Sequence, residues 1–210
     1  MGSELVSQYY ERFHQASGKQ GTMMIPERLD FIREEVGSQK DVIELGCRYG
    51  DLLSHLLTGN HVMGIDVDRH AVELCRRRFG IPAQVANLNE RLPLADQSFD
   101  VVVLSEVLEH LPYPELTLGE AARILRPNGK LIGSVPNATK AQNRIRFLLT
   151  GRVETDPTHL HYFSEKALVA HLSQFFERWQ FRYVGGRYRI ISPRWLASYI
   201  LFTAGPPRHS

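Results

Sequence analysis

Between residues 41 and 136, short apolar segments alternate regularly with amphipathic helical segments. The apolar segments are Val42–Leu45, His61–Ile65, Ala83–Ala86, Phe99–Leu104 and Lys130–Val135. The last two contain runs without the polar alternation of a half-exposed strand, which is typical of strands covered on both faces. Strands and helices that alternate with short connections predict a parallel sheet with right-handed crossovers. This rhythm constrains the fold more than any other feature of the chain.

The helices between these strands are recognisable from their spacing. In Pro114–Leu125, apolar residues recur three, four and seven positions apart, which places them on one face. The other expected helices are residues 3–17, one that begins near Pro26, Arg69–Phe79, Gln142–Leu149 and Glu165–Gln174. After Pro136 the rhythm breaks, and two strands are expected near the end: Trp179–Val184 and Tyr188–Ile191. Gly185-Gly186 between them reads as a hairpin turn.

We therefore predict an α/β fold, with a doubly wound, mostly parallel seven-stranded sheet, an antiparallel C-terminal edge hairpin and helices on both faces. Residues 1–38 are expected to form an N-terminal helical cap and residues 39–136 the Rossmann-like core. Residues 137–210 are expected to add a substrate-loop insertion, the edge hairpin and a C-terminal tail to the same domain.

Charge and cysteine usage narrow the class of protein. The net charge of +2 over 210 residues gives no reason to expect a nucleic-acid partner. Cys47 and Cys75 suggest neither a disulfide framework nor a metal-ligand spacing, so a reducing compartment fits. No signal pattern and no apolar run of about 18 residues stands out. We expect a cytoplasmic protein.

A glycine turn follows the first predicted strand, at the place where open parallel sheets bind ligands. A nicotinamide dehydrogenase would need glycine at positions 46, 48 and 51, whereas the chain has Gly46, Arg48 and Asp51. Those glycines let backbone amides approach a pyrophosphate, so their loss argues against a dinucleotide. Asp66 ends the second predicted strand, where a carboxylate can accept two hydrogen bonds from a ribose diol.

Several segments, in order, resemble the signatures of class I (Rossmann-like) S-adenosylmethionine-dependent methyltransferases of the small-molecule type (methyltransferase type 11). They are Glu44–Gly50, Gly64-Ile65-Asp66, Asn87-Leu88 with Leu92–Val102, Ser105–Leu111 and Leu125–Leu131. The resemblance covers about residues 40–136. It implies a transferase that moves a methyl group from S-adenosyl-L-methionine to a small-molecule acceptor and releases S-adenosyl-L-homocysteine. The acceptor atom is expected to be oxygen or nitrogen, on a sugar, lipid or other metabolite.

Carried over position by position, the resemblance implies a set of cofactor-binding residues. Gly46 and Gly50 would shape the turn around the amino-acid end of the cofactor, with Glu44, Cys47 and Arg48 in the same motif. The remaining positions are Asp66 at the ribose hydroxyls, Val67 against the adenine face, Asn87 and the Leu88 amide at the adenine edge, and Ser105 at the methionine end. An alternative for Asn87 is a turn residue that uses its side chain locally.

Arg48 departs from the family pattern, which has glycine there. That glycine usually lets the backbone lie against the methionine part of the cofactor. Arg48 either narrows the site or holds the cofactor carboxylate with its guanidinium. The sequence leaves both readings open.

Catalytic candidates lie after the fifth strand, in the segment from Asp156 to Phe163. His159 and His161 point the same way if this stretch is extended, and they could act as a base and its partner or as metal ligands. We select both as catalytic candidates and assign no metal site. His110, in a Glu-His pair after the fourth strand, is more typical of a structural role.

Features of the second half of the chain suggest partners. Val135-Pro136-Asn137, the Arg144–Arg152 stretch and the later His-Leu-His are similar to methyltransferase-like proteins of the MetW type. That similarity implies an alternative, a cofactor-binding accessory protein that regulates a partner enzyme. From Arg178 onward there are six arginines and no acid. We expect a helix over Pro193–Gly205, docked on the core, on a second subunit of a homodimer, or on a membrane or lipid surface.

Overall fold

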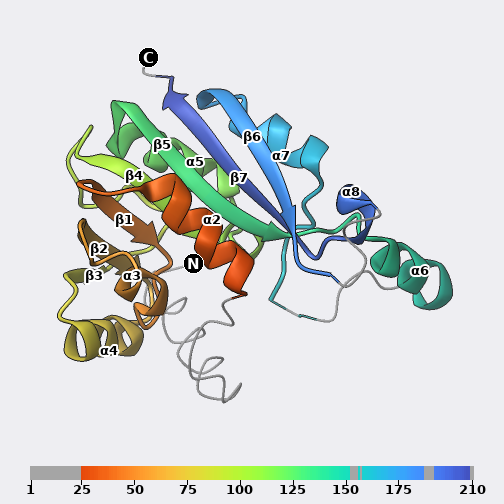
Figure 1. Ribbon diagram of the computed structural model, residues 1–210, viewed down its shortest axis with the longest axis horizontal. Helices are drawn as coiled ribbons and strands as arrows, with labels where there is room; N and C mark the ends of the chain where they lie inside the picture. Colours follow the sequence, from red (N-terminus) through yellow and green to blue (C-terminus); the bar gives the residue numbers. More distant parts are fainter. Residues whose placement is uncertain (1–24, 152–155, 157, 187–191, 209–210) are drawn as a thin grey trace.

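The computed structural model describes residues 25–151, 156, 158–186 and 192–208 (Figure 1). Seven strands form one mixed sheet in the order β3-β2-β1-β4-β5-β7-β6. The strands are β1 (Asp41–Leu45), β2 (His61–Asp66), β3 (Ala83–Val85), β4 (Phe99–Ser105), β5 (Leu125–Pro136), β6 (Phe176–Val184) and β7 (Tyr199–Pro207). Strands β1 to β5 pair in parallel, and β7 pairs antiparallel with both β5 and β6. The predicted fold class is confirmed.

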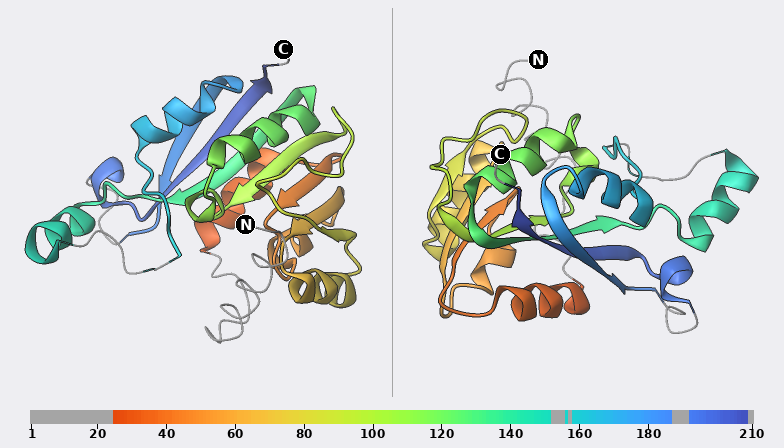
Figure 2. Two further views of the ribbon diagram at one scale, coloured as in Figure 1. Left: turned by 180° about the vertical axis from the view of Figure 1, so that it is seen from behind. Right: turned by 90° about the horizontal axis from the view of Figure 1, so that it is seen from above.

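Helices cover both faces of this sheet (Figure 2). The α2 helix (Pro26–Val36), the short α3 (Asp51–Ser54) and α4 (Arg69–Phe79) contribute buried side chains to one apolar cluster. The α5 helix (Pro114–Ile124) and α7 (Glu165–Leu172) contribute theirs to the other cluster. A sheet packed on both faces explains why its central strands are apolar without alternation.

The last strand corrects two expectations. Residues 193–205 do not form the expected docked helix, because only α8 (Pro193–Leu196) is helical and the chain then enters β7. Ile200, Leu201 and Phe202 are fully buried within the sheet, so they cannot insert into a membrane. β6 pairs with β7, whereas its expected partner, residues 188–191, lies outside the described residues, as does the expected helix 3–17.

One helix stands apart from the body of the molecule. The α6 helix (Ala141–Thr150) follows β5 and projects away from the sheet, near α8 (Figures 1 and 2). None of its side chains is buried. Its base is held by the buried Asn137, whose side-chain amide donates to the carbonyls of Arg194 and Ala197 at 3.1 and 3.0 Å. Within the described part of the chain, no helix is long and apolar enough to cross a bilayer.

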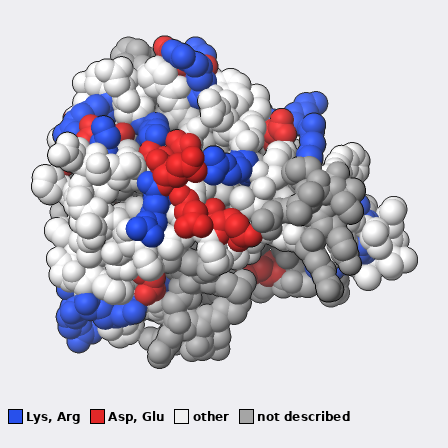
Figure 3. Space-filling model, in the orientation of Figure 1, with Lys and Arg blue, Asp and Glu red and all other residues white. Residues whose placement is uncertain are grey.

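Charges of both signs cover the face of the molecule that carries α2. Figure 3 shows acidic side chains gathered there beside basic ones. Glu34 pairs with Arg182 at 2.8 Å and Glu35 with Lys130 at 3.0 Å. These ion pairs link α2 to β6 and β5, so this face is electrostatically mixed.

Candidate functional site

The parallel strands bring the candidate residues to one edge of the sheet. Strands β1, β2, β3 and β4 all end on the same side, at Leu45, Asp66, Val85 and Ser105. Their following turns therefore face a common space, which is the usual ligand position of an open parallel sheet. β7 begins at this edge too, since Tyr199 pairs with Pro136 at the end of β5.

The glycine turn is anchored to the neighbouring strand. The backbone amides of Gly46 and Cys47 both donate to the carbonyl of Ile65, at 2.7 and 2.9 Å. Gly46 has a φ of 86°, and a Cβ there would lie 2.6 Å from a methyl carbon of Val107. Both the conformation and the close approach require glycine. The turn then enters α3 through Gly50, which is also left-handed.

Asp66 holds this turn with its carboxylate. Its Oδ2 accepts a hydrogen bond from the backbone amide of Arg48 at 2.7 Å, and its Oδ1 accepts one from the amide of Asp68 at 2.9 Å. Arg48 occupies the left-handed region with a φ of 47°, a conformation in which the family's glycine is unstrained. The arginine places a cationic side chain at the turn, with its guanidinium carbon 5.0 Å from the centroid of the Tyr49 ring.

Glu44 lies below the turn in β1 and is 4 % exposed. Burial, with smaller effects of Cys75 and Asp66, raises the pKa of its carboxyl well above the usual value. Its Oε2 has no hydrogen-bond partner among the described residues. A buried acceptor without a donor is costly, and the ammonium group of an amino acid would donate to Oε2 and favour the charged carboxylate. The residues of this edge therefore fit the methionine end of S-adenosylmethionine.

The other expected cofactor residues surround the same edge. The backbone amide of Ala86, which precedes Asn87, donates to the carbonyl of Asp66 at 3.0 Å and so ties the end of β3 to β2. Asn87 uses its side chain locally, donating to Glu90 at 2.8 Å and accepting from Asn89, and Leu88 is buried. The Ser105 hydroxyl lies 3.2 Å from that of Ser134. Val67 directly follows Asp66 and is half-buried. Their contacts with a cofactor stay a prediction.

Glu106 is a candidate that the sequence analysis did not select. It follows β4 with a φ of 57°, and such strain in a non-glycine residue clusters at functional sites. Its carboxylate accepts a hydrogen bond from Ser134 at 2.8 Å and lies 3.3 Å from the buried guanidinium of Arg28 in α2. Burial raises the pKa of this carboxyl despite the cation. The acid beside Ser105 was visible in the sequence, but its partner in α2 was not.

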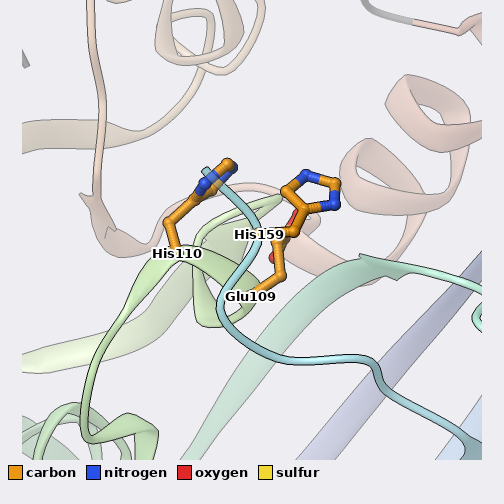
Figure 4. Close-up of side chains that lie close together, drawn as sticks. All are labelled: Glu109, His110 and His159. Carbon is orange, nitrogen blue, oxygen red and sulfur yellow. The ribbon is translucent and has the colours of Figure 1, made fainter. Parts of the chain in front are cut away.

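A second cluster combines Glu109 and His110, in the 3-10 helix η1 (Leu108–His110), with His159 (Figure 4). One ligand atom of each residue lies within 4.8 Å of the other two. Glu109 is 1 % exposed, and burial raises the pKa of its carboxyl. The rings of His110 and His159 meet edge to face with centroids 4.8 Å apart. His110, for which a structural role was expected, is thus next to a predicted catalytic residue.

His161 takes a different position from His159. Its Nε2 lies 3.4 Å from the carbonyl oxygen of Pro112, and its ring centroid is 6.0 Å from that of Phe163. The carbonyl of Glu109 accepts hydrogen bonds from the amides of Leu160 and His161, at 2.8 and 3.1 Å. These bonds hold the segment after Asp156 against η1, so both predicted histidines lie beside the loop that follows β4.

Comparisons with known proteins agree with this geometry. Residues 43–133 match the family model described as a methyltransferase domain. A phthiotriol/phenolphthiotriol dimycocerosates methyltransferase of Mycobacterium ulcerans is 37 % identical over 100 residues, which cover 45 % of this chain and 37 % of that protein. A ubiquinone biosynthesis O-methyltransferase of Hahella chejuensis is 34 % identical over 121 residues, covering 53 % and 50 %. The chain thus spans about half or less of these relatives.

The fold has close counterparts among solved structures. A methyltransferase from Archaeoglobus fulgidus superposes with a TM-score of 0.67 at 17 % identity, covering 99 % of this chain and 95 % of that one. At this identity the likeness establishes the fold alone. Residues 43–133 are thus similar to methyltransferase domains, and the described part of the chain has the fold of this methyltransferase structure.

Proposed function

We propose that this protein transfers a methyl group from S-adenosylmethionine to a hydroxyl group of a small-molecule acceptor. The observation that carries the proposal is the edge formed by the glycine turn, Asp66 and Glu44, whose buried Oε2 has no hydrogen-bond partner among the described residues. This edge lies within the segment that matches methyltransferase domains. The hydroxyl is preferred as acceptor atom because imidazoles stand next to this edge and one relative is named an O-methyltransferase.

At the cofactor end, the chain's own side chains would bind and orient S-adenosylmethionine. Glu44 would accept from the ammonium group, and Arg48 would hold the carboxylate. The Asp66 carboxylate, which two backbone amides hold in place, would accept hydrogen bonds from the ribose hydroxyls. Val67, Asn87, Leu88 and Ser105 would enclose the adenine and methionine parts. The bound cofactor supplies an electrophilic methyl group on a sulfonium sulfur.

At the acceptor end, the protein would align the acceptor hydroxyl with the methyl group and remove the proton of that hydroxyl. We assign proton uptake to His161. Its Nε2–H points to the carbonyl of Pro112, which leaves Nδ1 with the lone pair of the neutral ring. His159, with Glu109 and His110, would hold the acceptor oxygen. The products are a methyl ether, S-adenosylhomocysteine and one proton.

Compartment and partners follow from the same proposal. Cys47 and Cys75 are both buried thiols, which fits the reducing cytoplasm. The acceptor is a small molecule, and no nucleic-acid partner is proposed. A regulatory subunit without turnover, the alternative from the MetW-like pattern, remains an outcome of the experiment below.

The test is S-adenosylhomocysteine formation with a panel of catechols, phenols and long-chain alcohols as acceptors. Turnover is expected with at least one class. The variant His161→Gln should lower kcat about 10²- to 10⁴-fold, as expected for loss of a general base, and should leave cofactor affinity unchanged. Cofactor binding without turnover on any probe would contradict the proposal and favour the accessory role.

A further inference from the structure

The cluster of Glu109, His110 and His159 has the composition of a metal site. Two imidazoles and one carboxylate, with ligand atoms within 4.8 Å of one another, converge from η1 and from the segment after Asp156. Bound Zn²⁺, with bonds of about 2.0–2.1 Å, holds tetrahedral ligand atoms roughly 3.3 Å apart. Both histidine side chains are only half-buried, so rotation of their rings can close the remaining gap.

His110 is oriented as a ligand would be. Its Nδ1 lies 3.1 Å from the carbonyl oxygen of Thr158, so the proton belongs on Nδ1 and the lone pair on Nε2. Histidines that bind metals almost always donate their other ring N–H to a carbonyl or carboxylate in this way. Thr158 is fixed in turn by Asp156, whose Oδ1 accepts from its amide at 2.9 Å and from its hydroxyl at 2.6 Å.

Glu109 provides an independent reason for a cation. Neither of its carboxylate oxygens accepts a hydrogen bond from another described residue, although both are buried. A buried carboxylate is stable only when it is protonated, paired or bound to a metal. Glu109 is 1 % exposed, so a divalent cation held together with the imidazoles of His110 and His159 would supply the partner that both of its oxygens lack among the described residues.

We propose that Glu109, His110 and His159 bind one divalent transition metal ion, with Zn²⁺ as the best fit. Two histidines and a glutamate with a fourth position open are a common catalytic zinc set. Imidazole nitrogens suit Zn²⁺, whereas Mg²⁺ and Ca²⁺ select oxygen ligands. The ion also fastens the segment after Asp156 to η1, which places His161 beside the acceptor.

The chemical use of the ion rests on the proposed methyl transfer; its binding does not. The acceptor hydroxyl takes the open position, where the cation lowers its pKa. Its proton passes to His161, and the oxygen forms a bond to the methyl carbon. The carbon–sulfur bond breaks, and its electron pair stays on the sulfur. The methyl ether then leaves the metal.

The test is metal binding by the full chain, measured without turnover. Protein stripped with a chelator is dialysed against Zn²⁺, Mn²⁺ or Mg²⁺, and bound metal is counted by mass spectrometry. Co²⁺ serves as a spectroscopic probe of coordination number. Glu109→Gln and His159→Gln remove ligands. His161→Gln is the matched control, since it lies in the same segment outside the cluster.

One Zn²⁺ per chain is expected, with affinity at least 30-fold weaker in both ligand variants and unchanged in the control. Absence of Zn²⁺, Mn²⁺ and Co²⁺ binding by the folded wild type overturns the metal site, as does equal affinity in folded His159→Gln. Cofactor titration run in parallel separates the two proposals. Metal binding without turnover would support the metal site and contradict the proposed methyl transfer.

A separate observation concerns the projecting helix α6. Its Ile145, Leu148 and Leu149, spaced as one helical face, are 57, 82 and 79 % exposed. Arg144 and Arg146 flank this face, and α6 contains no acid. The Arg144 guanidinium lies 4.0 Å above the ring of Trp195 in α8, itself 47 % exposed.

We infer that α6 and Trp195 contact an anionic lipid surface. An exposed apolar face bordered by arginines matches the acyl boundary and the phosphate headgroups at once. A protein partner explains the apolar face but does not require basic residues on both of its sides. The lipid contact was expected from residues 193–205. We assign it instead to α6, which follows β5 at the sheet edge that carries the candidate site.

Flotation with vesicles of phosphatidylcholine alone and with added phosphatidylglycerol tests this inference. Binding only to the anionic vesicles is expected, with at least a tenfold loss in the double variant Leu148→Glu/Leu149→Glu. Leu116→Glu, at an exposed leucine of α5, should bind as the wild type does. Failure of the wild type to float, or a dimer that the double variant dissociates, contradicts the lipid contact.

Discussion

Strands β4 and β7 both lie inside the sheet, but they reach that position by different routes. β4 belongs to the parallel half, in which the connections between strands are short and their helices pack on the sheet. β7 enters antiparallel beside β5 only after α6, α7, β6 and α8 have been placed. The parallel half brings the turns after four strands to one edge, where we propose that the cofactor binds. The segments before β7 leave α6 exposed and His159 half-buried at the surface, where the proposed acceptor would bind.

The largest expected effect tests whether β7 is part of the core. Phe202 is fully buried, and a Cβ on Gly133 of β5 would collide with its ring. Phe202→Ala should lower the free energy of unfolding by about 3–5 kcal/mol in urea, because it leaves a cavity. A loss below about 1 kcal/mol would show that residues 199–207 are a peripheral tail.

Glu44→Gln sharpens the comparison at the parallel edge. In the wild type, burial raises the pKa of the Glu44 carboxyl. Between pH 4.5, its ordinary pKa, and the raised pKa, the folded state therefore binds more protons than the unfolded state. The stability that the protonated Glu44 carboxyl contributes is therefore fully present below pH 4.5 and is lost as pH rises through the raised pKa. Glutamine does not titrate, so the variant should exceed the wild type in stability at pH 8 by at least about 1 kcal/mol.

The same variant should bind S-adenosylmethionine more weakly, by about 10- to 100-fold, because a hydrogen bond to a charged group is lost. Thermal unfolding across pH and calorimetric titration check the two effects. Equal stability at pH 8 together with unchanged affinity would remove Glu44 from the site.

Arg48→Gly decides between the two readings of that position. We expect affinity for S-adenosylmethionine to fall about tenfold if the guanidinium holds the carboxylate, and affinity for the decarboxylated cofactor to stay the same. Glycine relieves the strain of the left-handed backbone, but it raises the conformational entropy of the unfolded chain. Because these effects oppose each other, the free energy of unfolding should stay within about 1 kcal/mol of the wild type. Tighter binding of both ligands would mean that Arg48 narrows the site.

The smallest effect is expected at α6. Leu148→Ala removes a large apolar side chain that is 82 % exposed, so the free energy of unfolding should change by less than about 0.5 kcal/mol. The contrast with Phe202→Ala measures directly how differently the two regions are packed. A loss above about 2 kcal/mol would mean that α6 is covered by another part of the chain or a second copy.

Local patterns located the strands of the parallel half, although β5 begins at Leu125, before its expected start at Lys130. They were insufficient for β7. The expected strands Val42–Leu45 and His61–Ile65 and the helix Arg69–Phe79 match the observed elements to within a residue, because each repeats a short-range period. In β7, the run Ile200-Leu201-Phe202 is apolar on both faces, since the strand lies between β5 and β6. A continuous apolar run does not distinguish a helix from a buried strand.

The candidate site divides in the same way. Asp66 and the glycine turn could be found from the sequence, because their positions follow from the end of a strand. The partnership of His159 with Glu109 and His110 joins residues about fifty positions apart, and that of Glu106 with Arg28 joins two elements with no shared motif. Such pairs depend on tertiary packing that no local period encodes.

The central claim is that the edge around Asp66 binds S-adenosylmethionine. Calorimetric titration of the cofactor and of S-adenosylhomocysteine into the wild type and Asp66→Ala tests it directly, with Asp68→Asn as control, because asparagine also caps α4. We predict micromolar binding to the wild type and the control, and its loss in Asp66→Ala. Absence of binding to the folded wild type, or equal affinity in Asp66→Ala, would contradict the account.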